Sequence, residues 1–235
     1  MDSLRRLEAE IAHCRTCPRL VAWRELVARD KRAAFRAWDY WGRPVPGFGD
    51  PEAHLLIVGL APAAHGGNRT GRVFTGDRSG DFLYASLYRC GYANQPTSEH
   101  RDDGLRLDGC WITAAVKCAP PANKPTPAER DNCRPYLERE FALLPALRVV
   151  VALGRFGWDA VCAHERVRPR PAFGHGAEVE LPSARILLGS YHPSQQNTFT
   201  GKITDAMLDV VFQRARRLAA SRRASASEPG GDGEH

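Results

Sequence analysis

Four side chains in the polar segments of this sequence, Phe74, Asp77, Asn123 and His192, could together carry out chemistry. An aromatic ring such as Phe74 can stack on a flat group, and a carboxylate such as Asp77 can hold a water molecule or stabilise a cation. The amide of Asn123 offers the donor and the acceptor that a uracil-like imide edge needs. His192 can donate to an oxygen that becomes negative. These abilities match the cleavage of a flipped nucleobase from DNA, which must be stacked, recognised and relieved of charge as it departs.

The first of these segments is a glycine-rich loop that follows an apolar run. Residues 55–58 are apolar, as expected of a buried strand, and the loop occupies residues 59–77. It has no Gly-Lys-Ser/Thr ending and no G-x-G-x-x-G spacing, so the usual phosphate-binding loops are excluded. The loop predicts a site for a flat, polar, anionic group. It offers backbone donors, one cation (Arg69 or Arg72), one aromatic ring and one carboxylate.

Four of the seven cysteines stand in settings typical of metal ligands: Cys14, Cys17, Cys118 and Cys133. The first two form a Cys-x2-Cys pair just before a proline, and Cys118 precedes Ala119-Pro120-Pro121, so both settings are turns that can direct a sulfur inward. Four thiolates suit either zinc or a [4Fe-4S] cluster, and the spacing leaves both open. Disulfides are not expected in a reducing compartment. The remaining cysteines lie in or beside apolar segments and are expected to be core thiols: Cys90, Cys110 and Cys162.

Apolar periodicity and capping signals predict helices that alternate with strands. Helices are expected at residues 3–12, 18–37, 80–90, from 126 onward and at about 204–219, and strands at 55–58, 111–116, 149–153 and 185–188. The helix after Thr126 starts with a capping box, and Pro135 predicts a break or kink in it beside Cys133. This alternation predicts an α/β sandwich with a mainly parallel sheet, in which the loops that follow the strands share one edge.

Length, composition and charge favour one basic domain. The chain has 235 residues, of which 43% are hydrophobic, and its formal net charge is +6, which favours an anionic partner. We expect a single domain over residues 1–220 and a disordered tail over 221–235, because the tail is rich in Ser, Gly and Arg. No stretch approaches eighteen apolar residues and no apolar segment follows Met1, so a soluble cytoplasmic protein without a membrane partner is expected.

Five segments taken together resemble the uracil-DNA glycosylases, and most closely the type 5 (B-type) branch of that superfamily. These segments are residues 59–66, 68–72, 74–77, 118–125 and 192–197, and the resemblance covers nearly all of the chain from Cys14 to Thr204. It implies a three-layer α/β sandwich with a central four-stranded parallel sheet between helices.

The resemblance also implies roles for single residues. The catalytic residues would be Asp77, Asn123 and His192. The substrate-binding residues would be Ala61, Ala63, Phe74, Asn123 and Ser194. A structural [4Fe-4S] cluster, bracing loops that face the DNA backbone, would be held by Cys14, Cys17, Cys118 and Cys133.

The implied function is that of a monofunctional hydrolase of base-excision repair. It would flip uracil, and also other deaminated bases such as hypoxanthine and xanthine, out of double-stranded DNA and leave an abasic site. We expect a monomer associated with the nucleoid in the cytoplasm. The alternative is a non-catalytic iron–sulfur or zinc DNA-binding module on the same fold.

The first motif departs from the wider superfamily. Many relatives place Asp or Glu close behind the first glycine, where this chain has Leu60 and Ala61. The negative charge would therefore come from Asp77, which could act as a general base or stabilise the sugar cation electrostatically. Simpler roles are also open: Asp77 could cap the helix near Ser79, Asn123 could be a turn residue and Phe74 a core residue, and Arg69 and Lys124 could be solvated or phosphate-bound.

Overall fold

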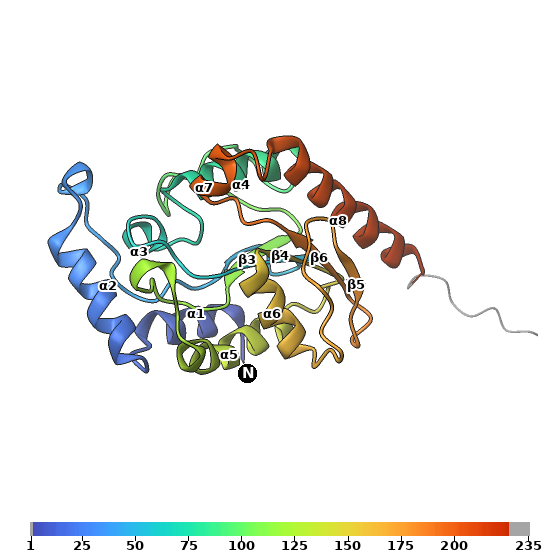
Figure 1. Cartoon of the computed structure of the whole chain (residues 1–235), viewed down its shortest axis with the longest axis horizontal. Coiled ribbons are helices and arrows are strands. Elements are labelled where there is room, and N and C mark those ends of the chain that lie inside the picture. The colour runs from blue at the N-terminus through green and yellow to red at the C-terminus, as the bar shows by residue number, and fades with distance from the viewer. Residues whose placement is uncertain (1, 226–235) are drawn as a thin grey trace, which may run out of the picture.

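The computed structural model of this chain describes residues 2–225, and Figure 1 shows their arrangement. The helices are α1 (Leu4–His13), α2 (Pro18–Asp30), α3 (Gly67–Thr70), α4 (Arg78–Arg89), α5 (Pro127–Ala142), α6 (Arg155–His164), α7 (Gln195–Phe199) and α8 (Asp205–Ser225), with short 3-10 helices η1 (Ala33–Phe35) and η2 (Pro121–Asn123). The strands are β1 (Phe48–Gly49), β2 (Leu55–Gly59), β3 (Cys110–Ala114), β4 (Val149–Leu153), β5 (Glu178–Glu180) and β6 (Ile186–Ser190).

Within the described residues the strands form one sheet in the order β1-β3-β2-β4-β6-β5. The four inner strands β3, β2, β4 and β6 run parallel, and all their residues are buried, as expected of a parallel sheet covered on both faces. The predicted central four-stranded parallel sheet is therefore confirmed. Its two antiparallel edge strands were missed, because β1 has only two residues and β5 has the exposed charged ends Glu178 and Glu180.

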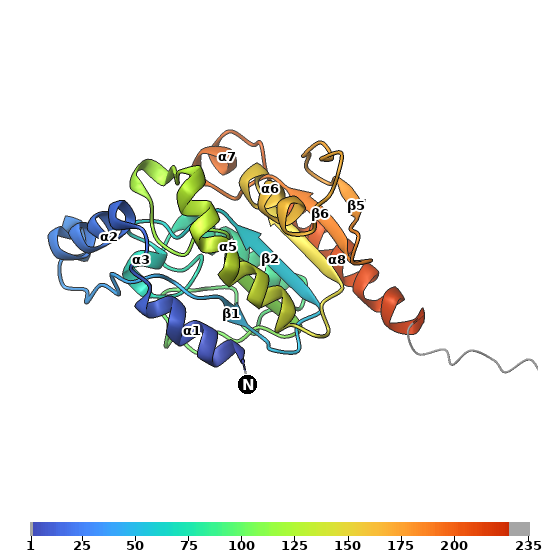
Figure 2. The ribbon, with the colours of Figure 1, turned by 90° about the horizontal axis from the view of Figure 1, so that it is seen from below.

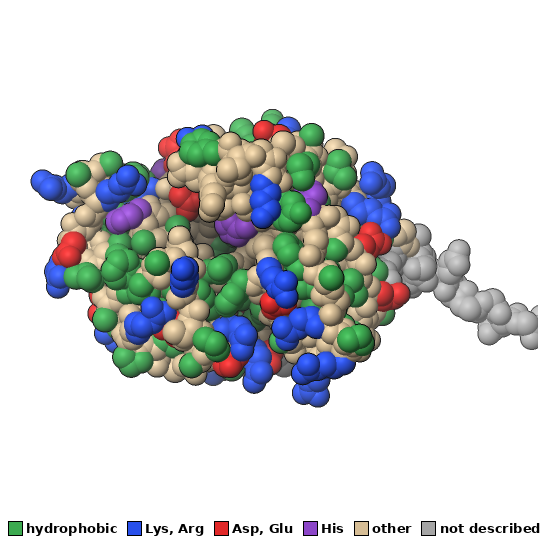
Figure 3. Space-filling model, viewed as in Figure 1, with side chains coloured by type: hydrophobic (Ala, Val, Ile, Leu, Met, Phe, Trp, Pro, Cys, Tyr) green, Lys and Arg blue, Asp and Glu red, His purple; other side chains and the backbone are tan. Residues whose placement is uncertain are grey.

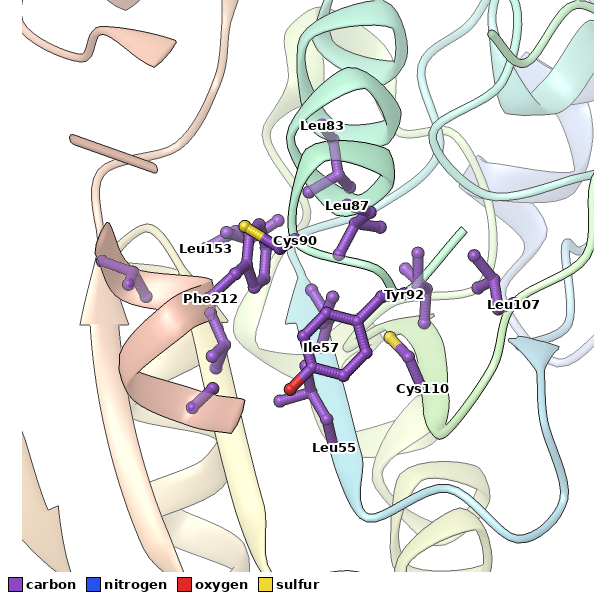
Figure 4. Close-up of a cluster of buried hydrophobic side chains, with 14 of the residues drawn as sticks. Leu55, Ile57, Leu83, Leu87, Cys90, Tyr92, Leu107, Cys110, Leu153 and Phe212 are labelled. Carbon is purple, nitrogen blue, oxygen red and sulfur yellow. The ribbon is translucent and has the colours of Figure 1, made fainter. Parts of the chain in front are cut away.

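Alternate side chains of the inner strand β2 enter two separate apolar layers, because successive side chains of a strand point to opposite faces. Leu55 and Ile57 belong to the layer that includes Tyr92 and Phe212, which Figure 4 shows between α4 and α8. Leu56 and Val58 pack on the other face, against residues of α5 and α6. In Figure 1 α4 and α8 lie above the sheet, and Figure 2 shows α1, α5 and α6 covering it from below. The predicted three-layer arrangement is thus present.

The reciprocal cap predicted at the start of α5 is present and also joins two helices. Thr126 Oγ1 accepts the backbone N–H of Glu129 at 3.2 Å, and Glu129 Oε2 accepts that of Thr126 at 2.8 Å. Arg19 on α2 donates to both carboxylate oxygens of Glu129, at 2.8 and 2.7 Å. The cap therefore connects the helix that follows Cys17 with the helix that contains Cys133.

Two predicted helix features differ from the structure. The helix expected over residues 18–37 ends at Asp30, because Lys31 has a positive φ of 52° with which an α-helix does not continue. The break that the sequence allowed at Pro135 does not occur, because α5 continues through it to Ala142. The proline removes one backbone hydrogen bond, and the helix around it tolerates that loss.

The last helix is longer than predicted. α8 continues to Ser225, so the prediction of a disordered tail over residues 221–235 is wrong for residues 221–225, and residues 226–235 lie outside the described part of the chain. Neither α8, with 21 residues, nor any other described helix is long and apolar enough to cross a membrane.

Candidate active site

A hollow of about 210 Å³ lies where the loops that follow β2, β3 and β6 come together, at the shared edge that the sequence predicts. Figure 3 shows this face of the molecule, with Lys and Arg side chains spread around its centre. Every predicted catalytic or substrate-binding residue except Ser194 lines it. The residues that line this strand-end hollow are Leu60, Ala61, Pro62, Ala63, Val73, Phe74, Asp77, Ser79, Ala114, Asn123 and His192.

Phe74 reaches the strand-end hollow from a strained backbone. Its φ is 50°, in the left-handed region that is unfavourable for a residue with a Cβ atom. The ring lies against the end of β2, where a Cβ atom added at Gly59 would be 2.7 Å from a ring carbon, so only glycine fits there. The ring centroid is 5.8 Å from that of His192. Phe74 also packs against the core, so its core role and its position in the hollow coexist.

Asp77 is both the cap of α4 and the carboxylate of the strand-end hollow. Its Oδ1 accepts the backbone N–H groups of Ser79 at 2.9 Å and Gly80 at 3.1 Å. Its Oδ2 lies against Gly66, where an added Cβ atom would be 2.0 Å away. Burial raises the pKa of Asp77, while the two backbone N–H groups oppose the shift. Oδ1 therefore caps α4, and Oδ2 remains available to interact with a bound group.

Asn123 lines the rim of the strand-end hollow from η2, in the loop that follows β3. Ala122 and Asn123 have φ values of 52° and 56°, two consecutive residues in the left-handed region. The backbone N–H of Asn123 donates to Pro120 O at 3.2 Å, so the turn role considered for Asn123 is also present. The turn is held by the backbone, and the exposed Asn123 lines the hollow.

His192 follows β6 and is half-buried. Burial lowers the pKa of His192 to about 4, so the imidazole is neutral at pH 7, with one N–H donor and one acceptor nitrogen. The side chain of Asn197 donates to the backbone carbonyl of His192 at 2.9 Å and so fixes the start of the loop. His192 is therefore suited to donating a hydrogen bond within the strand-end hollow.

Ser194 caps a short helix and lies outside the lining of the strand-end hollow, so its substrate-binding role stays a prediction. Its Oγ accepts the backbone N–H of Asn197 at 3.3 Å and caps α7, outside the residues that line the strand-end hollow. A serine at a helix start is favourable for this reason alone.

The two arginines of the glycine-rich loop are buried, and neither is available to an anion in the hollow. The guanidinium of Arg69 lies over the rings of Phe35 and Trp38, which are nearly perpendicular to each other, at 3.9 and 4.0 Å from their centroids. It donates to the carbonyls of His65 and Gly76, at 2.8 and 2.7 Å, and so joins the two halves of the loop. The expectation that Arg69 is solvated or phosphate-bound is therefore wrong, whereas Lys124 is exposed.

Arg72 is also paired within the protein. It donates to Asp103 Oδ2 at 2.6 Å and to Ser98 Oγ at 2.8 Å, and both partners belong to the polar segment before β3. The predicted single cation for an anionic ligand thus does not come from this loop.

The four predicted metal ligands lie near one another and come from three segments. Cys17, Cys118 and Cys133 are buried together, Cys14 is half-buried, and all are free thiols. Burial raises the pKa of Cys118 to about 12 and that of Cys133 to about 11, and the sulfur of Cys14 contributes to both shifts. Within residues 2–225, no group of three or more His, Cys, Asp or Glu side chains is arranged to hold a metal ion. We refer to Cys14, Cys17, Cys118 and Cys133 as the cysteine cluster.

Arg24 links the cysteine cluster to the glycine-rich loop, and nothing in its sequence setting marks it out. Its side chain is 2% exposed, with Nη1 donating to Cys118 Sγ at 2.9 Å and Nη2 to the carbonyl of Cys14 at 3.0 Å. The side chain of Asn68 donates to the carbonyl of Arg24 at 3.2 Å. The guanidinium thus places a positive charge in contact with a buried sulfur.

Several residues that form the walls of the strand-end hollow were not predicted from the sequence. Most of the missed residues adjoin predicted ones along the chain, and Ala114 ends a strand whose last side chain faces the hollow. These residues are Leu60, Pro62, Val73, Ser79 and Ala114.

Comparison with known proteins gives consistent matches over most of the chain. The family model of the uracil DNA glycosylase superfamily matches residues 46–216. A type-5 uracil-DNA glycosylase of Mycobacterium tuberculosis is 56% identical over 220 residues, which are 92% of this chain and 82% of that protein. The type-5 enzyme of Thermus thermophilus is 57% identical over 207 residues, 88% of this chain and 94% of that protein. A type-4 uracil-DNA glycosylase of Sulfurisphaera tokodaii is 31% identical over 230 residues, 93% of this chain and 86% of that protein.

Proposed function

The chain belongs to the type-5 branch of the uracil DNA glycosylase superfamily, and we propose that it removes uracil from double-stranded DNA by hydrolysis in the strand-end hollow. The observation that carries this proposal is the set of side chains gathered there: the ring of Phe74, the amide of Asn123, the neutral imidazole of His192 and the carboxylate of Asp77. The product is an abasic site, the starting point of base-excision repair.

Binding requires the uracil to leave the helix and enter the hollow, because its glycosidic bond cannot be reached inside a duplex. One face of the base stacks on Phe74. The amide of Asn123 pairs with the imide edge, whose N–H and carbonyl match its acceptor and donor. Ala61 and Ala63 have small side chains and leave room for the plane of the base.

Cleavage breaks the bond between the sugar C1′ and the base nitrogen, and the electron pair leaves with the base. The N–H of His192 donates to the base oxygen on which this charge develops. The free Oδ2 of Asp77 stabilises the positive sugar and holds the water that adds to C1′. The proton of that water passes to Asp77 and then to solvent, and the departing base takes a proton from solvent.

The same hollow is proposed to accept other deaminated bases such as hypoxanthine and xanthine. Each of them presents an N–H beside a carbonyl, which is the pair that the amide of Asn123 recognises. Leu60 and Ala61 line the hollow where many relatives carry a carboxylate. This wall is therefore apolar, and the side chain of Ala61 is small. A larger purine would therefore meet no charged group there.

The cysteine cluster is proposed to hold a [4Fe-4S] cluster. The donor set fits, because four thiols free of disulfides lie near one another and Arg24 places a positive charge beside one sulfur. Hydrolysis of a glycosidic bond needs no electron transfer, so the metal cluster would serve as a brace. It would join the N-terminal helices to the loop that contains both Cys118 and Asn123.

We further propose that the protein acts as a monomer at the nucleoid in the cytoplasm. Its net charge of +6 favours association with DNA, and contacts with phosphates release counterions. DNA affinity should therefore fall as salt rises, and a flat response would count against a DNA substrate.

A duplex with one uracil opposite guanine tests the proposed reaction directly. Incubation with the protein, followed by alkali, should cut the uracil strand at the abasic site. Asn123→Ala should lose most of this excision and keep its fold and DNA affinity, whereas Lys124→Ala should keep most of the excision. An iron-loaded protein that leaves the duplex intact would favour the non-catalytic alternative, and colourless protein with one zinc would contradict the iron–sulfur proposal.

A further inference from the structure

Among the described residues, Phe199 at the end of α7 is the most exposed large hydrophobic residue, at 63%. A single exposed apolar side chain is ordinary on a protein surface and needs no explanation. Phe199 differs because a guanidinium lies over its ring: Arg78 is 4.7 Å from the ring centroid. Figure 1 shows α7 beside α4, the helix that Arg78 begins.

Arg78 places this pair next to the strand-end hollow. It follows Asp77 directly in the chain and is itself exposed. A cation over an aromatic face restrains the ring at modest energetic gain when both groups are exposed. The ring of Phe199 is therefore held in place while its other face remains in solvent.

The strand-end hollow and two further hollows share lining residues in sequence and lead to Phe199, and we refer to the three together as the groove. A second hollow shares Ala63, Asp77 and Asn123 with the first and is also lined by Arg32 and Gln195. A third hollow shares Arg78 and Asp81 with the second and ends at Thr198 and Phe199. The groove thus begins where the base is bound and ends at an aromatic ring.

The chemistry along this groove matches a strand of nucleic acid. Arg32 and Arg78 are exposed cations that line it and can contact phosphates, and Arg78 also offsets the charge of Asp81, which lines the same part of the groove. The aromatic ring at its end suits the face of a base, because every base can stack on an aromatic side chain. Flipping one nucleotide also takes a stacking partner away from its neighbour.

We propose that Phe199, restrained by Arg78, stacks on the base that adjoins the flipped nucleotide in the damaged strand. The proposal rests on the proposed removal of uracil from DNA. It assigns Phe199 to substrate binding rather than to bond cleavage, and it makes Arg78 a positioning residue for the ring. The polar side chains at the start of α7, Gln195 and Gln196, are the competing candidates for filling the space beside the flipped base.

The test compares excision by the wild type and by Phe199→Ala on a duplex with uracil opposite guanine. Loss of one base–aromatic stack predicts a fall in kcat/KM of about 5- to 150-fold. Phe199→Trp should restore most of the rate. Tyr88→Ala is the matched control, because Tyr88 is a 48% exposed aromatic residue on α4 that lines none of the three hollows. Thermal unfolding should show all variants folded as the wild type is.

Two further duplexes locate the stack, each with an abasic analogue in place of one neighbour of the uracil. If Phe199 stacks on the neighbouring base, the difference between wild type and Phe199→Ala disappears on one of these duplexes and persists on the other. The proposal is overturned if Phe199→Ala excises like the wild type, or if its loss persists on both duplexes. If Gln196→Ala loses excision and Phe199→Ala excises like the wild type, the contact with the neighbouring base would belong to the start of α7. A wild type that leaves the unmodified duplex intact would instead overturn the proposed function.

Discussion

The strand-end hollow and the cysteine cluster adjoin at Ala61, which lines the first and packs against the second, yet they are built in different ways. The hollow takes its chemical groups from loops after three parallel strands, and two of these groups, Phe74 and Asn123, lie on backbone with positive φ. The cysteine cluster brings an N-terminal segment against a loop and a helix that lie more than a hundred residues away in the sequence. Three of its four cysteines are buried.

This difference separates chemistry from stability. A side chain in the hollow is positioned by a backbone that the sheet already fixes, so changing it should alter the rate and leave the fold. A cysteine in the cluster holds distant segments together, so changing it should alter the fold first and the rate as a consequence.

The largest effect is expected from Cys118→Ser. If the four thiols hold a metal cluster, its binding free energy contributes directly to folding, by about 10 kcal/mol in small structural metal sites. We expect the variant to lose iron and to unfold at a much lower temperature. Iron analysis and thermal unfolding measure both, with the buried Cys162→Ala as control. If the variant keeps the wild-type midpoint of thermal unfolding, the cysteine cluster does not stabilise the fold.

Asp77→Asn should give the opposite pattern, with a rate about 10²- to 10³-fold lower, as for loss of one group that stabilises transition-state charge. Asn still accepts the N–H groups of Ser79 and Gly80 and caps α4. Because burial raises the pKa of Asp77, its charge disfavours the folded state, and the variant should be at least as stable as the wild type. Single-turnover excision and thermal unfolding test both halves, with the exposed Asp102→Asn as control.

The pH profile of excision should show which group titrates in the hollow. Asp77 must be ionised, so kcat/KM should fall as pH drops through a pKa that lies above the usual range of aspartate. His192 is neutral above its lowered pKa of about 4, so no step is expected near pH 6.5, where an ordinary histidine titrates. A profile from pH 4.5 to 9 measures this, and Asp77→Asn should remove the acid limb. A step near pH 6.5 that disappears in His192→Gln would contradict the neutral imidazole.

The inner sheet and the strand-end hollow were predictable from sequence because both follow from local patterns. Apolar runs such as residues 149–153 mark buried strands, and loops that follow parallel strands must meet at one edge. Phe74, Asp77, Asn123 and His192 lie in such loops. Their catalytic roles remain predictions, carried by the resemblance and by this shared position.

The buried arginines could not be predicted because their surroundings come from remote segments. A charged side chain is mostly exposed, so Arg69 was expected to be solvated or bound to a phosphate. Its burial depends on Phe35 and Trp38, which lie some thirty residues earlier, the first inside the helix expected over residues 18–37 and the second just after it. Such contacts between remote segments leave no periodic signal in the sequence. The same holds for Arg24, whose partner Cys118 is 94 residues away.

The smallest effect is expected from Arg24→Lys, which keeps the charge beside Cys118 but removes the fork of donors. Arg24 reaches Cys118 Sγ and the carbonyl of Cys14 with two different nitrogens, and a lysine ammonium cannot match both positions. Loss of one such hydrogen bond costs about 1 kcal/mol. We expect a slightly lower free energy of unfolding and faster iron release to a chelator, with the excision rate of the iron-loaded variant nearly unchanged. A large loss of excision at full iron content would instead show that Arg24, through Asn68, positions the glycine-rich loop itself, and the separation between the two regions would fail at this residue.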